Sequence, residues 1–449
     1  MSLTISAPTY PEGFLPSGND IIFTALSTSA SQSGFAYLID VYVNGNAVIQ
    51  LRQSPITPSQ AIRINVKNIV SNYISSIFPA SLWTLSVAPE IAQVYIGVTE
   101  YYGGQPYDTA NSVPVTIWNS VAQWNDMKKG VDRFIRNFTP YTGGSVHTDG
   151  RMLAYHNTCS ISPFITNGPG IGGLTTVRID TNSIPKYQTN YNIPHYISMF
   201  TKFGLGVTNP FAPYVVIAGF DSTGLMIKKY VYATNVDSSL NKTIFTQDIR
   251  IYPTMSATYR YKRFTELDLD TMDDCTYFMV YPCYTFNGNC TVADTPTLYP
   301  VCFEINRRKE SFAILYKSSD GGWGQIQMNN KTQNEVNVET TTKLDTIPTT
   351  WTNQSRLIST IDIKAQGQWI LNTGWIENGM FADIEDLIIS PQIYLIHQPD
   401  SSVNDVTKIE YIPVQLSNNT YVVKETKAVN LRNYELTFTE SFYKNTIRE

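Results

Sequence analysis

The sequence predicts a mainly β protein built from several antiparallel β-sandwich domains, immunoglobulin-like or fibronectin-like, with a few short helices. Apolar and polar residues alternate over runs of strand length, and turn signals separate these runs. The 29 tyrosines add side chains that favour pleated, half-buried positions. At 449 residues the chain is long enough for about three domains. We place them at residues 1–112, 113–310 and 311–449.

The N-terminal domain is predicted from a clear hairpin signal. Residues 35–43 alternate in polarity, Asn44 and Gly45 form a tight-turn pair, and residues 47–51 supply the return strand. Apolar residues at helical spacing predict a short helix over residues 66–77. Residues 101–107 are expected to form an exposed aromatic loop. Further strands are expected over residues 83–87 and 94–101.

The middle region, residues 113–310, carries shorter strand signals that begin with residues 113–118. Residues 214–220 and 225–232 flank the turn Asp221-Ser222-Thr223-Gly224 and predict a hairpin. Residues 277–284 and 299–305 form a second predicted pair. Strands at this spacing without a long helix indicate a second sandwich.

The C-terminal domain begins with the strand Phe312–Tyr316, which a turn at Asp320, Gly321 and Gly322 separates from a strand that starts at Trp323. A helix is expected at about residues 378–390, because apolar residues share one face and Pro391 stops it. The other strands are expected over residues 335–340, 357–365, 369–375, 393–396, 421–424 and 434–438.

The charge balance limits the partners. Only 15% of residues are charged and the formal net charge is −5, whereas nucleic-acid binding needs a basic surface. We therefore expect no nucleic acid as the main partner. The N-terminus lacks the features of a signal peptide, and no window approaches 18 apolar residues, so we expect no membrane span.

Several motifs resemble functional sites but lack features that those sites need. The GxGxxG match at residues 168–173 is followed by a strand pattern rather than the helix that a dinucleotide site needs. The acidic stretch at 266–274 lacks the glycine and distal glutamate of a calcium loop. The four histidines are scattered, and no GxSxG elbow occurs. We expect no catalytic residue and no cofactor. The alternative is an enzyme that uses a facing pair among the 37 acidic residues, which the sequence alone does not identify.

The cysteines and tryptophans leave two alternatives. The five cysteines form no CxxC pair, so we expect reduced, buried thiols, with a zinc site at the four cysteines between 275 and 302 as the alternative. The tryptophans of the last domain are expected in the core, Trp369 and Trp375 included. If they were exposed, they would suit stacking on sugar rings.

The order of several motifs resembles a known family. These are "Asp40-Val41-Tyr42-Val43-Asn44-Gly45", "Phe312-Ala313-Ile314-Leu315-Tyr316…Gly321-Gly322-Trp323", and "Ile384-Glu385-Asp386-Leu387-Ile388-Ile389-Ser390-Pro391-Gln392-Ile393-Tyr394-Leu395". They resemble virion structural proteins from tailed phages of Bacteroidetes hosts, including crAss-like phages. The resemblance implies β-sandwich domains assembled into a ring or collar at the tail or portal. It implies a protein made in the bacterial cytoplasm and located in the virion tail, and it carries over no catalytic residue.

These expectations define a non-enzymatic virion protein that acts by assembly. Its partners would be copies of itself in a ring and other phage tail or portal proteins. The alternatives are a receptor-binding or carbohydrate-recognising tail protein and a glycan-degrading tail enzyme. The predicted contact residues are those of hairpin tips and of an aromatic loop: Asn44, Gly45, Tyr101, Tyr102, Tyr107, Asp320, Gly321 and Gly322.

Overall fold

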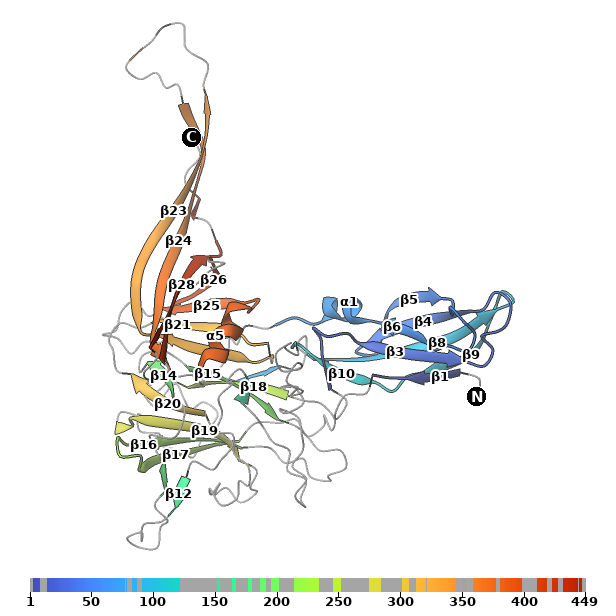
Figure 1. Ribbon diagram of the computed structural model, residues 1–449, viewed down its shortest axis with the longest axis horizontal. Helices are drawn as coiled ribbons and strands as arrows, with labels where there is room; N and C mark the ends of the chain where they lie inside the picture. The colour runs from blue at the N-terminus through green and yellow to red at the C-terminus, as the bar shows by residue number, and fades with distance from the viewer. Residues whose placement is uncertain are drawn as a thin grey trace.

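The computed structural model confirms a mainly β protein with several antiparallel sheets and short helices (Figure 1). The helices of the described chain are α1 (Lys67–Val70), the 3-10 helix η2 (Ser71–Tyr73) and α5 (Phe381–Ile388). The structure describes residues 3–8, 14–76, 78, 83–86, 91–121, 152–153, 164–166, 177–179, 186–190, 195–201, 214–233, 245–251, 274–283, 301–306, 312–319, 321–344, 350, 352, 358–376, 380–397, 410–417, 422–426, 431–442 and 444–445.

Two sheets form the N-terminal unit and share one hydrophobic core. The larger sheet buries the alternate residues of its central strands against the smaller one, as expected for strands with one wet face. The smaller sheet has the order β1 (Leu3–Ser6), β3 (Ile22–Ser27), β6 (Ile62–Asn65). The larger has the order β2 (Phe14–Pro16), β10 (Val115–Trp118), β8 (Ile91–Tyr102), β4 (Ala36–Val43), β5 (Asn46–Gln53), with β9 (Gln105–Asn111) paired to β8.

The predicted hairpin at Asn44 and Gly45 is confirmed, since β4 and β5 pair around it. The predicted helix over residues 66–77 is shorter than expected, because α1 ends at Val70 and a 3-10 turn follows it. Only Val70 of α1 is buried, so little apolar contact supports a longer helix at this place.

Sheet membership does not change at residue 112. Strand β10 follows this position but pairs with β8 and β2 in the N-terminal unit. Conversely, β7 (Trp83–Ser86) pairs with β18 (Phe245–Ile251), in the middle of the chain. Most strand pairs are antiparallel, whereas β10 pairs with β2, and β14 (Lys186–Asn190) with β20 (Val301–Asn306), in parallel.

The described part of the middle region contributes to three sheets, and both predicted pairs in it are confirmed. β16 (Tyr214–Phe220) pairs with β17 (Met226–Ala233), and β19 (Tyr277–Cys283) pairs with β20 (Val301–Asn306). The four-stranded sheet has the order β11 (Met152–Leu153), β15 (His195–Thr201), β18, β7, and a two-stranded sheet joins β12 (Phe164–Thr166) to β13 (Val177–Ile179). The five-stranded sheet has the order β14 (Lys186–Asn190), β20 (Val301–Asn306), β19 (Tyr277–Cys283), β16 (Tyr214–Phe220), β17 (Met226–Ala233).

A nine-stranded sheet dominates the C-terminal part. The predicted strands over 357–365 and 369–375 are one strand, β24, and β26 was not predicted. The sheet order is β22 (Trp323–Met328), β21 (Phe312–Lys317), β25 (Ile393–His397), β26 (Glu410–Leu416), β28 (Leu431–Glu440), β24 (Ile358–Ile376), β23 (Asn330–Leu344). Strand β27 (Val422–Thr426) pairs with β28, and β29 (Lys444–Asn445) pairs with β24.

This sheet is buried on both faces near α5, whose apolar residues join the larger core cluster. Trp369 lies in that cluster and Trp323 in the smaller one, as predicted. Trp375 was expected in the core, but its side chain is 48% exposed, because the register shift between Asn372 and Trp375 interrupts the alternation of β24.

An aromatic contact joins the segment after α1 to the C-terminal sheet. The Phe78 ring lies 4.7 Å from Tyr394, 5.4 Å from Tyr411 and 6.1 Å from Trp323, measured between ring centroids. The backbone N–H of Val121 also donates to the carbonyl of Ser319 over 2.8 Å. The N-terminal unit is therefore connected to the C-terminal sheet by side-chain packing and by hydrogen bonding.

Candidate interaction surfaces

The Asn44-Gly45 turn is an exposed and well-defined hairpin tip. Both residues have positive φ angles, 51° and 82°, which match the twist of the flanking strands. The backbone N–H of Asn44 donates to Gln93 O, and its side-chain oxygen accepts from Gln93 N. These bonds fix the tip to the neighbouring strand, so it presents a rigid polar edge.

Residues 101–107 form a hairpin rather than the expected loop. Strand β8 continues to Tyr102, Gly103 and Gly104 make the turn, and β9 begins at Gln105. The rings of Tyr102 and Tyr107 stack with centroids 3.8 Å apart and an interplanar angle of 5°. The pairing of Tyr101 with Pro106 and of Tyr102 with Gln105 closes the hairpin, and a register shift between Thr99 and Tyr101 follows it. The sequence pattern alone did not reveal this pairing.

The stacked tyrosines belong to an aromatic group at the end of the larger N-terminal sheet. Phe35 stacks on Tyr102 with centroids 5.8 Å apart, and the Arg52 guanidinium lies 5.1 Å from the centroid of the Tyr101 ring. Tyr107 is 50% exposed. Because Tyr101 and Tyr102 are consecutive in β8, they point to opposite faces of the sheet. This end of the sheet therefore offers the half-exposed Tyr107 ring on one face and Arg52 against Tyr101 on the other.

The two N-terminal sets of predicted contact residues are not brought together. In the β4–β8 register, Val43 pairs with Val94, whereas Ala36 pairs with Tyr101. The Asn44 turn and the tyrosine hairpin therefore lie at opposite ends of β4, roughly 24 Å apart along the strand. They would contact different partners or different parts of one partner.

The turn between β21 and β22 is an internal junction. Gly321 and Gly322 are buried, and Asp320 lies outside the described residues. The carboxylate of Asp386 on α5 accepts from the backbone N–H of Ser319 at 3.0 and 3.2 Å. The predicted contact between this tip and a neighbouring copy stays a prediction, but its two glycines lie below the surface of a single chain.

The most prominent exposed element was not predicted as a surface. The outer parts of β23 and β24 form a ribbon, residues 335–344 and 358–367, that projects from the rest of the sheet (Figure 1). Near its base, β29 pairs with β24 at Lys364 and Ala365. In an antiparallel pair, residues directly opposite each other point to the same face. The sequence contained a signal for this arrangement, namely the alternation of valine and threonine with polar residues from 335 to 344.

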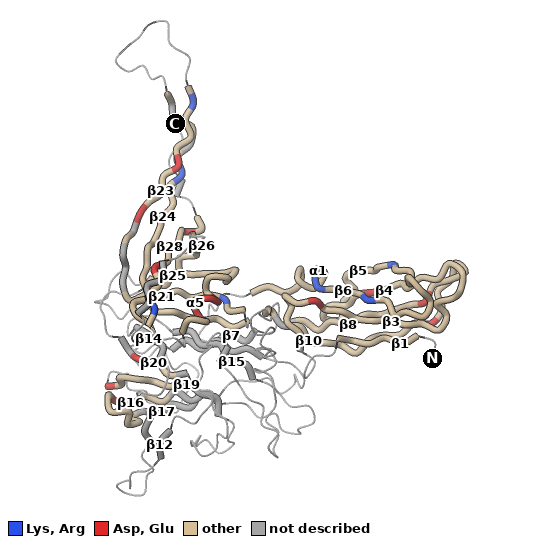
Figure 2. The backbone as a smooth tube through the Cα atoms, in the orientation of Figure 1, with Lys and Arg blue, Asp and Glu red and all other residues tan. Residues whose placement is uncertain are grey.

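The ribbon is amphipathic. One face, which we call the apolar ribbon face, carries Val336, Val338, Thr340, Thr342 and Leu344 from β23 and Ile358, Thr360, Ile363, Ala365 and Gly367 from β24. The other face carries Glu335, Glu339 and Lys343, with Glu339 opposite Lys364. Figure 2 shows blue and red positions along the ribbon, whereas charges are sparse over most of the described chain.

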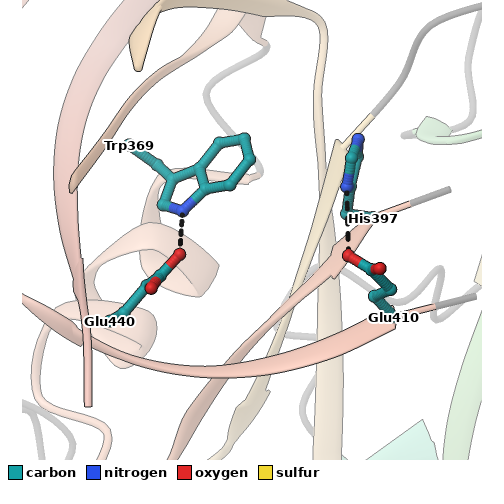
Figure 3. A network of polar contacts seen from close by, with 4 residues as sticks. All are labelled: Trp369, His397, Glu410 and Glu440. Carbon is teal, nitrogen blue, oxygen red and sulfur yellow. Dashed lines mark hydrogen bonds and ion pairs between the residues drawn. The ribbon is translucent and has the colours of Figure 1, made fainter. Parts of the chain in front are cut away.

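A polar network holds the base of the ribbon (Figure 3). The indole N–H of Trp369 on β24 donates to the Glu440 carboxylate on β28 over 3.2 Å, and the Gln366 side chain donates to the Glu440 carbonyl. A Cβ at Gly367 would lie 2.4 Å from that carboxylate. Only glycine at this position leaves enough space for the Glu440 side chain. These contacts join β24 to β28 where the ribbon leaves the body.

His397 and Glu410 form the second pair in Figure 3. Their Nδ1 and Oε2 atoms are 3.7 Å apart, a distance for an ion pair rather than a hydrogen bond. The imidazole is stacked on Phe312 with centroids 5.0 Å apart. The stacking fixes the ring against the sheet, and the arrangement stabilises strand pairing.

The remaining chemical motifs add no site in the described chain. The GxGxxG match, the acidic residues 266–273, and His147 and His156 lie outside the described residues. The side chains of Cys275 and Cys302 are buried, as predicted for these two thiols. Within the described ranges, His, Cys, Asp and Glu form no cluster of three suited to a metal ion. The helices described here are too short or too polar to cross a bilayer.

No family model matches the chain, and no curated protein does either.

Proposed function

We propose that this chain is a structural virion protein of a tailed bacteriophage, a subunit of a ring or collar in the tail or portal-proximal apparatus. It acts through homo- and hetero-oligomeric assembly and not through catalysis. The same proposal places it in the virion tail after synthesis in the host cytoplasm. It also assigns the two-sheet N-terminal unit to the immunoglobulin-like sandwiches, because a three-stranded and a six-stranded sheet share one core.

The observation that carries the proposal is the combination of several sheets with protrusions that expose aromatic or aliphatic side chains. Tyr107 is half exposed at a hairpin end, and Val336 and Val338 are more than half exposed on the ribbon. Tyrosine is enriched in protein interfaces, and charge is depleted at their centres. The motif order that resembles phage virion proteins supports the same reading.

The proposal is tested on virus particles and on purified protein. The protein should be found by mass spectrometry in purified particles, and an antibody against it should label the tail or the portal vertex in electron micrographs. The recombinant chain should form larger assemblies as its concentration rises. A chain that stays monomeric at high concentration and is absent from particles would overturn the proposal.

A receptor-binding or carbohydrate-recognising tail protein is the second candidate. It is favoured by Trp375, which is 48% exposed, and by the partly exposed Tyr107, since exposed aromatic rings suit stacking on sugars. A glycan array with the purified chain separates the two functions. Binding that is lost in both Trp375→Ala and Tyr107→Ala would favour recognition, and absence of binding would favour assembly.

A further inference from the structure

We propose that the apolar ribbon face is the docking surface for the same face of a second copy of this chain, in an antiparallel, two-fold arrangement. This goes beyond the proposed function, because a two-fold contact joins copies in pairs and does not by itself close a ring.

The first step of the argument is the continuity of this face with the protein core. Leu371, Trp369, Gly367, Ala365 and Ile363 follow one another on the same face of β24, since successive alternate residues of a strand share a face. Leu371 and Trp369 are buried in the larger core cluster. The core face of the sheet thus continues outward onto the ribbon.

The second step is the exposure of the outer part. On a single chain Val336 is 62% exposed, Val338 57%, Leu344 82% and Ile358 59%, and Ile361 at the bulge is 50% exposed. The first four of these side chains lie on the apolar ribbon face, and with the exposed Thr340 and Thr342 between them they expose on the order of 500 Å². A patch of this size is often functional in soluble proteins. An isolated two-stranded hairpin is only marginally stable in water, so covering this face would also stabilise the ribbon.

The third step is charge. The apolar ribbon face carries no charged residue from Val336 to Leu344 on β23, nor at its assigned positions from Ile358 to Gly367 on β24. Glu335, Glu339, Lys343 and Lys364 point to the opposite face. Two charged residues from other strands belong to the face: the position of Lys444, opposite Ala365, and the Glu440 carboxylate beside Gly367, which is already buried in the single chain. Outside these two positions the strands can meet their copies without burying a charge, which would be costly.

The fourth step is the order of residues, which makes the surface self-complementary. Apolar side chains lie at the base, Val336 and Val338, and at the outer end, Leu344 and Ile358, with threonines between them. A two-fold axis between Thr340 and Thr342 would place the base of one ribbon over the outer end of the other. Val338 of one copy then meets Leu344 of the other, and Thr340 meets Thr342. On the second strand, Ala365 meets Ile358 in the same way.

The buried area sets the expected strength. About 500 Å² from each copy amounts to about 1,000 Å² for the pair, which is at the lower end for specific interfaces. We therefore expect a reversible dimer whose population depends on concentration. Such a contact suits a protein whose assembly adds many weak contacts together.

The decisive experiment measures the dimer by sedimentation equilibrium of the full chain. Val338→Glu places a charge on the apolar ribbon face. Because both copies carry the substitution, the two-fold contact contains two added charges, and the dimer dissociation constant should rise at least tenfold. Asn337→Glu is the matched control, because it adds the same charge at the next residue on the opposite face and should change the constant less than twofold. Equal effects of the two variants, or a wild-type chain that never pairs, would overturn the inference.

A cross-linking measurement tests the register. Packed sheets lie about 10 Å apart, so Thr340→Cys should be joined to its copy by a short bismaleimide reagent in a yield well above that of the wild-type chain. Thr341→Cys, on the opposite face, should give only the wild-type yield. Cross-linking of both variants to the same extent would refute the face-to-face arrangement.

The outcomes also separate this inference from the proposed function. A chain that is present in virions but insensitive to Val338→Glu would refute the ribbon contact alone. Capture of the ribbon only by a different virion protein, with no self-association, would also refute it. Ribbon-dependent pairing of a chain that is absent from virions would refute the structural function and leave the ribbon contact intact.

Discussion

Replacing Gly324 by alanine tests how closely the β21–β22 hairpin is packed. Gly324 is paired with Tyr316, and a Cβ built on it would lie 2.6 Å from Cζ, 2.7 Å from Oη and 2.9 Å from Cε1 of that ring. Side chains do not approach this closely, so the ring would have to move. Tyr316 is 1% exposed and lies in the larger core cluster, which leaves it little room.

The magnitude follows from two opposing effects. Overpacking of a core typically costs about 1–3 kcal/mol, whereas alanine reduces the freedom of the unfolded chain and recovers about 0.4–1 kcal/mol relative to glycine. The net loss should be about 1–2 kcal/mol. Because about 1.4 kcal/mol corresponds to a factor of ten in an equilibrium constant, the amides of β21 and β22 should exchange with deuterium about tenfold faster where exchange follows the opening of the hairpin.

The assay is hydrogen exchange of the full chain, read peptide by peptide, with a double-mutant cycle as the control. Tyr316→Leu removes the ring atoms that the new methyl group would meet, so Gly324→Ala should cost clearly less in that background. If the alanine has the same effect with the ring present and absent, or none in either, the proposed ring contact is wrong.

Two further predictions concern the junction and the N-terminal core. Phe78→Ala should remove the contact of the N-terminal unit with Trp323 and the two tyrosines around it. The loss of free energy should be at most about 3–5 kcal/mol if the junction does not repack. Limited proteolysis near residue 78 should become faster. Burial, opposed by a hydrogen bond from the Ser27 backbone and reinforced by the Glu100 carboxylate, raises the pKa of Tyr37 above its ordinary value of about 10. The folded chain then holds the phenol proton more tightly than the unfolded chain, so stability is fully present below pH 10 and falls as the pH rises through the pKa of the folded state.

Each of these has its own control. Tyr73→Ala, at a residue 45% exposed after α1, should leave the proteolysis pattern unchanged, and a junction unaffected by Phe78→Ala would show that this aromatic contact does not hold the two parts together. Tyr37→Phe should remove part of the loss of stability above pH 10 in urea titrations. An identical pH profile for Tyr37→Phe and the wild-type chain would contradict the assigned cause.

Local patterns were sufficient for the elements whose signal lies within a few residues. The Asn44-Gly45 hairpin, the β16–β17 and β19–β20 pairs, α5 and the buried face of β28 follow from turn chemistry and from the period of apolar residues. These features depend on backbone angles, which the turn residues restrict, and on side-chain alternation, which follows from the order of apolar and polar residues.

Those local patterns do not predict contacts between segments that are distant in the sequence. The pairing of β7 with β18 joins segments more than a hundred residues apart. Strand β10 belongs to the N-terminal sheet because it pairs with β8. The β21–β22 turn lies beneath the surface because α5 packs against it. Strand alternation tells which residues share a face, but only the assembled sheet decides whether another layer covers that face. For this reason the threonine- and valine-rich strand β23 could be recognised in part from its residues, whereas its exposure as a projecting ribbon came only from the three-dimensional arrangement.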